Sequence, residues 1–113
     1  MTIQNIDLLD KKFHALGDSS RREILALISK KQRCTAGELV DLFSSSQPTI
    51  SKHLKVLESA GLIIRHIEGR HHNFTLAADG LKEADAWIKR HIIFWENSLD
   101  RLGQFLDANN KDS

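Results

Sequence analysis

The sequence predicts a mainly α-helical fold with one β-hairpin, arranged as a single compact domain. Leu, Ile and Ala dominate the apolar residues, Tyr is absent and Pro occurs once, a composition that favours helices. Apolar residues recur at 3- and 4-residue steps along most of the chain, and a β-prone segment interrupts this period after Gly61. The 113 residues, 41% of them hydrophobic, are enough for a small core, and a chain this short often gains stability by dimerising.

Two helices are expected near the N-terminus. An apolar residue at every third or fourth position predicts the first helix over residues 6–16, and Gly17 ends it. The second helix is expected to start near Ser19, because Ser20 and Glu23 have the spacing of a capping box.

Two shorter helices follow, joined by a tight turn. Thr35 and Glu38 form another capping box, which opens the first of them. Residues 44–46 are three serines that form the turn, and one of them is the expected N-cap of the next helix. Pro48 lies within the first turn of that helix, where its missing N–H costs nothing. Two short helices joined in this way are the signature of a helix-turn-helix.

The period changes after the second short helix, which Gly61 ends. Residues 62–67 are rich in Leu and Ile, residues 73–76 form a second β-prone run, and Gly69 lies in the turn between them. A β-hairpin directly after a helix-turn-helix is a wing, so the expected architecture is a winged helix-turn-helix.

The last expected element is a long amphipathic helix over about residues 79–107. Its apolar stripe comprises Ile88, Ile92, Trp95, Leu99, Leu102 and Leu106. This stripe is longer than a small domain needs, and such a stripe usually meets a partner helix. We therefore expect one domain over residues 1–108, including a dimerisation helix, and a flexible tail over residues 109–113.

The second short helix divides into an apolar and a polar side. Ile50, Leu54 and Leu57 fall at positions i, i+4 and i+7 and are expected to face the core. The polar residues off this stripe are Gln47, Thr49, Ser51, Lys52 and Lys55. Gln, Thr and Ser can hydrogen-bond base edges, and Lys can neutralise phosphates, so this helix suits the major groove of double-stranded DNA.

Other cationic residues extend the predicted DNA-binding surface. Residues 18–76 hold nine Lys/Arg against six Asp/Glu and four His, although the whole chain carries a charge of only +1. Arg70 follows the turn glycine and is the strongest wing candidate. Arg65 and His71 are the other candidates on the hairpin. His53, Arg21 and Arg22 are each compatible with either a phosphate contact or a structural role.

Several segments together resemble one family of bacterial regulators. They are residues 15–25 (ALGDSSRREIL), 35–39 (TAGEL), 46–54 (SQPTISKHL), 57–63 (LESAGLI) and 68–70 (EGR). The chain is similar to the ArsR/SmtB family of winged-helix repressors, in a branch with an extended last helix. The resemblance implies a homodimer formed by the first and last helices, with Phe13 joining the stripe residues at the interface. It also implies that Gln47, Thr49, Ser51 and Lys52 bind the operator and Arg70 contacts phosphates or the minor groove. The usual role is a repressor released by an inducer.

The sensor sites of that family are not recognisable here. Thr35 and Gly37 stand where metal-sensing members carry a cysteine pair, and Cys34 is displaced from both positions. The last helix offers only His91 as a histidine ligand, and a single cysteine cannot form an intrachain disulfide. We therefore expect no metal and no cofactor, and the sequence does not identify an inducer. A metal- or thiol-responsive sensor remains one alternative, and a winged helix used as a protein-interaction module is another.

An enzyme and a membrane protein are both disfavoured. Ser19, Ser20 and Asp18 lie near His14, but helix capping explains them and no oxyanion-hole motif accompanies them. The N-terminus has no basic-then-apolar signal segment, and apolar runs are only about four residues long. The expected protein is soluble and cytoplasmic and has no membrane partner.

Overall fold

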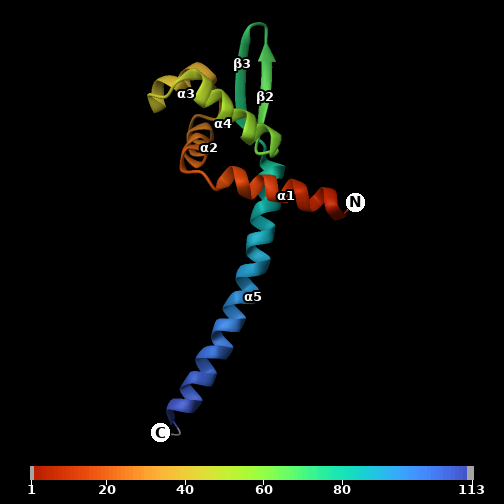
Figure 1. The fold of residues 1–113 in the computed structure, drawn as a ribbon, viewed down its shortest axis with the longest axis vertical. Coiled ribbons are helices and arrows are strands. Elements are labelled where there is room, and N and C mark those ends of the chain that lie inside the picture. The colour runs from red at the N-terminus through yellow and green to blue at the C-terminus, as the bar shows by residue number, and fades with distance from the viewer. Residues whose placement is uncertain (1, 112–113) are drawn as a thin grey trace.

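The computed structural model describes the backbone of residues 2–111 and the side chains of residues 8–109. The elements are α1 (Thr2–Leu16), α2 (Ser19–Lys31), β1 (Cys34–Thr35), α3 (Ala36–Phe43), α4 (Gln47–Ser59), β2 (Ile63–Glu68), β3 (His71–Leu76) and α5 (Ala78–Lys111). The chain is mainly helical with a β-hairpin after a helix-turn-helix, which confirms the predicted fold class. Figure 1 shows the hairpin and α5 projecting in opposite directions from the packed helices, over a longest extent of 72 Å.

The junction between α1 and α2 differs in detail from the expectation. The predicted capping box at Ser20 and Glu23 is wrong, because Asp18 is the N-cap and its carboxylate accepts from Arg21 N at 3.0 Å. Ser20 already lies inside the helix, whereas Asp18 has the extended backbone that an N-cap requires. Helix α1 begins at Thr2, before the expected residue 6, whose side chain lies outside the described residues.

The helix-turn-helix forms as predicted. Thr35 caps α3 by accepting from Glu38 N at 3.1 Å, and Ser46 caps α4 by accepting from Thr49 N at 3.3 Å. The three serines between the helices form the turn, and Ser44 adopts the left-handed conformation with φ of 50°. These side-chain caps satisfy backbone N–H groups that the helix starts leave unpaired.

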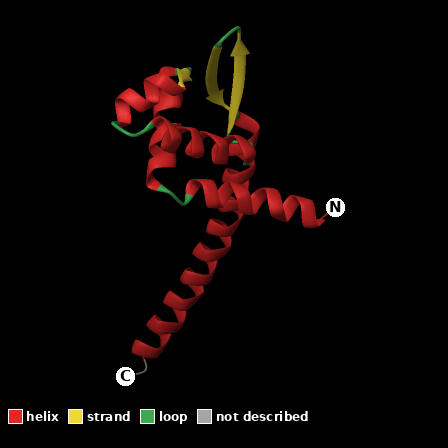
Figure 2. Cartoon of the chain, turned by 45° about the horizontal axis from the view of Figure 1, so that its top comes forward, coloured by secondary structure: helices red, strands yellow, loops and turns green. Residues whose placement is uncertain are grey.

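The hairpin is part of a three-stranded antiparallel sheet with strand order β1-β3-β2. Gly69 forms the turn with φ of +62°, a conformation that favours glycine. The two-residue strand β1 pairs with β3, so that Cys34 lies opposite Phe74. Figure 2 shows the strands in yellow among the red helices. The sequence did not predict β1, since two residues are too few to show a period.

A hydrogen-bonded turn at the end of α4 leads directly into the hairpin. Ile50, Leu54 and Leu57 are buried, which confirms the predicted core side of α4. Gly61 has φ of +73° and donates to Glu58 O, while Leu62 N donates to Leu57 O, both at 3.0 Å. This pair of bonds is a Schellman motif, which ends the helix and turns the chain directly into β2.

Helix α5 extends well beyond the core. Its 34 residues correspond to about 51 Å of helix, and they continue through the expected tail as far as Lys111. Ala84 near its start is buried, but the predicted stripe from Ile88 to Leu106 is between 39% and 65% exposed. Among residues 2–111, none of the helices has the length and apolarity that crossing a bilayer requires.

Candidate nucleic-acid interface

Helix α4 presents a polar face on the side opposite its buried stripe. Every residue predicted for that face is exposed: Gln47, Thr49, Ser51, Lys52 and Lys55. The Thr49 hydroxyl lies 2.8 Å from Ser46 Oγ, so it also takes part in the N-terminal cap. The N-terminal end of α4 thereby combines accessible side chains with a backbone fixed by its cap.

The face of α4 and the wing enclose a hollow of about 500 Å³. Its lining includes five residues predicted as DNA contacts: Gln47 and Ser51 from α4, and Arg65, Arg70 and His71 from the hairpin. Thr49, Lys52, His53 and Lys55 lie outside this lining. The fold therefore brings two segments more than ten residues apart in sequence to one concave surface.

Arg65 braces the wing against α4. Its Nε and Nη2 donate to the two carboxylate oxygens of Glu58 at 3.3 and 3.2 Å, and its Nη1 donates to His72 Nδ1 at 2.9 Å. The guanidinium carbon also lies 5.0 Å from the centre of the Phe74 ring. These contacts occupy much of the Arg65 guanidinium, whereas Arg70 is exposed beyond the turn.

Glu58 and His72 were not among the predicted site residues. Each contacts Arg65 across seven residues of chain, through the reversal that Gly61 makes and through the hairpin. No period or motif in the sequence marks such a contact. Only the polar character of Glu58 next to a helix end offered a signal.

His53 lies at the junction of α4 with the first two helices. Nη1 of Arg21 donates to its Nδ1 at 3.4 Å, and the same guanidinium donates to Ala15 O at 2.8 Å and His14 O at 3.0 Å. The backbone hydrogen bond from Arg21 lowers the pKa of Asp18, and the nearby Arg21 charge lowers it further. Both arginine candidates on α2 bind the end of α1, since Arg22 donates to Leu16 O at 2.7 Å.

The hairpin histidines have individual partners. His66 lies opposite Asn73 and shares a 2.8 Å hydrogen bond with Thr75, whereas His72 lies opposite Ile67. They therefore do not face each other across the strands. Within the described part of the chain, no three metal-ligating side chains of His, Cys, Asp or Glu gather at one point.

Cys34, in strand β1, is fully buried and belongs to the hydrophobic core. Burial raises the pKa of its thiol, and the Glu38 charge raises it further. A protonated, buried thiol is a poor nucleophile and a poor metal ligand.

Comparisons with known proteins place these features among bacterial regulators. A family model described as "Bacterial regulatory protein, arsR family" matches residues 18–65. The transcriptional repressor SdpR of Bacillus subtilis (strain 168) is 33% identical over 91 residues, which cover 80% of this chain and 100% of SdpR.

Two solved structures are also similar. An ArsR-like transcriptional regulator from Rhodococcus sp. RHA1 has a TM-score of 0.78 and 26% identity, covering 96% of this chain and 98% of that chain. A homodimeric winged helix-turn-helix DNA-binding domain from Mycobacterium bovis has a TM-score of 0.65 and 20% identity over 80% of this chain and 82% of that chain, a likeness of fold alone.

Proposed function

We propose, because this chain belongs to the arsR family of bacterial regulatory proteins, that it is a dimeric repressor of an inverted-repeat DNA operator. Its relatives are transcriptional regulators with a winged helix-turn-helix, not enzymes. The proposal adds the operator symmetry, the residues that bind DNA and the assembly. It also places the protein in the bacterial cytoplasm, where the operator lies.

The observation that carries the proposal is the hollow shared by α4 and the wing. Gln47, Thr49 and Ser51 lie on the N-terminal half of α4, where a recognition helix contacts base edges. Lys52 and Lys55 lie further along the same exposed face and would neutralise phosphates.

The hairpin supplies the second part of the DNA contact. Arg70 and His71 at the tip of the wing would reach the adjacent backbone or minor groove. Arg65 and His53 would hold these elements in place through Glu58 and Arg21, with any phosphate contact a secondary role.

The exposed stripe of α5 supports the dimer. A row of exposed large apolar side chains along one side of a helix is costly in water, and pairing with a second copy would bury it. The M. bovis domain with the same fold is homodimeric. Phe13 packs edge-on against Trp87, with 5.3 Å between the ring centres, and so joins α1 to the base of this stripe. A two-fold dimer would place two copies of α4 in successive major grooves, about 34–36 Å apart.

Fluorescence anisotropy across a salt series tests the proposal. The purified protein is titrated into a labelled duplex from its own upstream promoter and into a scrambled duplex of the same length. We expect tight binding to the promoter that weakens steeply with salt, because phosphate contacts release counterions. Equally weak, salt-insensitive binding to both duplexes would contradict the proposal and favour a winged helix that binds a protein partner.

A further inference from the structure

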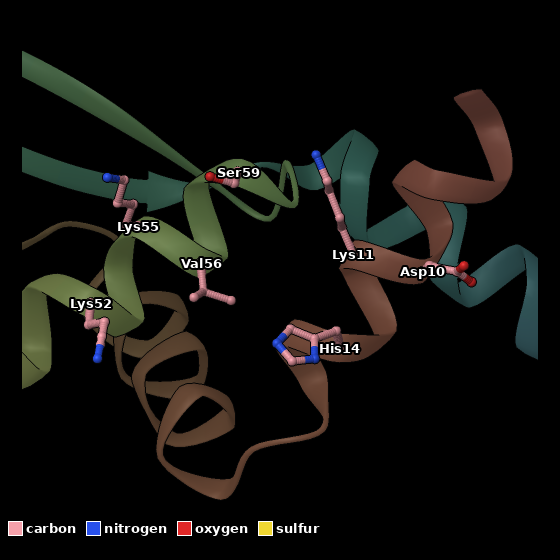
Figure 3. Close-up of a pocket in the computed structure, with 7 residues that line it drawn as sticks. All are labelled: Asp10, Lys11, His14, Lys52, Lys55, Val56 and Ser59. Atoms are coloured by element: carbon pink, nitrogen blue, oxygen red, sulfur yellow. The ribbon is translucent and has the colours of Figure 1, made fainter. Parts of the chain in front are cut away.

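A second hollow, of about 420 Å³, lies between α1 and α4. Its lining comprises Asp10, Lys11 and His14 from α1 and Lys52, Lys55, Val56 and Ser59 from α4 (Figure 3). This volume is within the range of small-molecule binding sites. The hollow borders the proposed DNA-binding face, because Lys52 and Lys55 belong to both.

The chemistry of the lining is apolar at the centre and cationic at the rim. Figure 3 shows Val56 and His14 pointing into the space from opposite helices, whereas the carboxylate of Asp10 is turned away from it. The aliphatic stems of Lys11, Lys52 and Lys55 extend the apolar wall. Their ammonium groups are exposed and can swing over a bound group, because lysine stems are flexible.

The charges around the hollow favour an anion. Three lysines stand against one aspartate, and the lysines come from both helices, so a single carboxylate could be approached from two sides. A simple inorganic anion would leave the Val56 surface in water. The lining instead matches a ligand with an apolar body and one carboxylate.

The Lys11 side of the hollow lies away from the contact between α1 and α5. Phe13 packs on α5, and residues two positions apart on a helix do not share a side, so Lys11 points away from that contact. Helix α1 therefore turns one side to α5 and carries Lys11 on another side, toward the hollow.

We propose that an amphipathic carboxylate binds between α1 and α4 and competes with DNA for Lys52 and Lys55. The competition rests on the proposed function, since the same two lysines are assigned there to phosphates. Such a ligand would act as the inducer, because binding it withdraws cationic side chains from the operator.

Calorimetry of the full chain with octanoate tests the site itself. We expect octanoate to bind, and 1-octanol and octylammonium to bind much more weakly, since they share the chain length but lack the negative charge. Lys11→Glu should weaken octanoate binding by at least roughly 5-fold, because it replaces an attraction by a repulsion without touching α4. The matched control is Lys30→Glu, an exposed lysine on α2 outside the hollow, which should retain the wild-type affinity. A lack of octanoate binding, or equal binding by Lys11→Glu and the wild type, would overturn the site.

Anisotropy with a labelled duplex tests the competition. At constant ionic strength, octanoate should raise the dissociation constant of the wild type for DNA, and it should do so less for Lys11→Glu. Unchanged DNA affinity at saturating octanoate would overturn the competition. The titration without octanoate tests the proposed function separately. If the protein does not bind DNA there, the proposed function fails, while octanoate binding measured by calorimetry would still support the site.

Discussion

The ammonium of Lys12 lies 3.2 Å from Oε2 of Glu83 and joins α1 to α5. Lys12 is only 1% exposed, whereas the Glu83 side chain is 62% exposed. The ammonium of Lys12 lies near Gly61, just after α4, and its Cε lies near Gly80, in the first turn of α5. One buried side chain thus lies where the proposed dimer helices meet the end of the recognition helix.

Shortening Lys12 should destabilise the fold more than removing its charge. Lys12→Ala leaves a cavity among three elements, so we expect the free energy of unfolding to fall by roughly 2–4 kcal/mol. Lys12→Met keeps most of the apolar stem and should lower the free energy of unfolding clearly less than Lys12→Ala does. Urea denaturation measures both, and Lys11→Ala on the exposed side of α1 is the control, expected within about 0.5 kcal/mol of the wild type. Equal stability of Lys12→Ala and the wild type would show that the buried stem contributes nothing.

Gly80 should be intolerant of any side chain. A Cβ built at residue 80 would lie 1.9 Å from the carbonyl oxygen of Gly61, so the two backbones would have to separate. We expect Gly80→Ala to destabilise the protein by about 1–3 kcal/mol, in the range of other overpacking substitutions.

Gly103, in the same helix, provides a matched comparison. A Cβ there meets no atom within 4 Å, and alanine is the better helix former, so Gly103→Ala should stabilise the protein by roughly 0.5–1 kcal/mol. Thermal unfolding of the two variants checks the pair. If Gly80→Ala raises the melting temperature as Gly103→Ala is expected to, the close approach of Gly80 to Gly61 is not a constraint.

The sequence was informative where one local pattern determines the structure. The 3- and 4-residue period of α4, the Thr35 cap, a serine cap on α4 and the turn at Gly69 all appear as predicted, and the structure identifies the capping serine as Ser46. The sequence was misleading at α2. Ser20 and Glu23 match a capping box there, but Asp18 has the extended backbone of the N-cap residue.

Contacts between distant segments could not be predicted in this way. From the sequence, a lysine in α1 is expected at the surface. Lys12 is buried only because the folded chain brings Gly61 and Gly80 beside it. The same holds for the Glu58–Arg65 pair and for strand β1, whose two residues gain their conformation from β3.

The two hairpin arginines should have separable roles. Arg65→Ala removes the contacts to Glu58 and His72, so we expect a small loss of stability, about 1 kcal/mol or less, together with weaker DNA binding. Arg70→Ala should weaken DNA binding for all sequences while leaving stability unchanged. Urea denaturation and anisotropy on the same preparations distinguish them. A loss of stability in Arg70→Ala alone would reverse the assignment.

The stripe on α5 should hold the dimer together. Leu99→Glu places a charge in the proposed interface, and we expect the dimer dissociation constant to rise by at least roughly 100-fold. Ile93→Glu is the control, because Ile93 is similarly exposed but lies off the stripe. Sedimentation equilibrium measures both variants. A dimer that survives Leu99→Glu but dissociates in Ile93→Glu would place the interface on the other side of α5.

A competition gel shift with single-base operator variants tests most directly whether the exposed face of α4 contacts the bases of DNA. Lys52→Ala should lower affinity by a similar factor for every duplex. It should also reduce the slope of the logarithm of the binding constant against the logarithm of the salt concentration by about one. Gln47→Ala should lower affinity for the intact operator. It should also reduce the differences in affinity among the single-base operator variants, because a base-edge contact is lost. If both substitutions leave affinity and base preference unchanged, the face of α4 that carries Gln47 and Lys52 does not contact DNA.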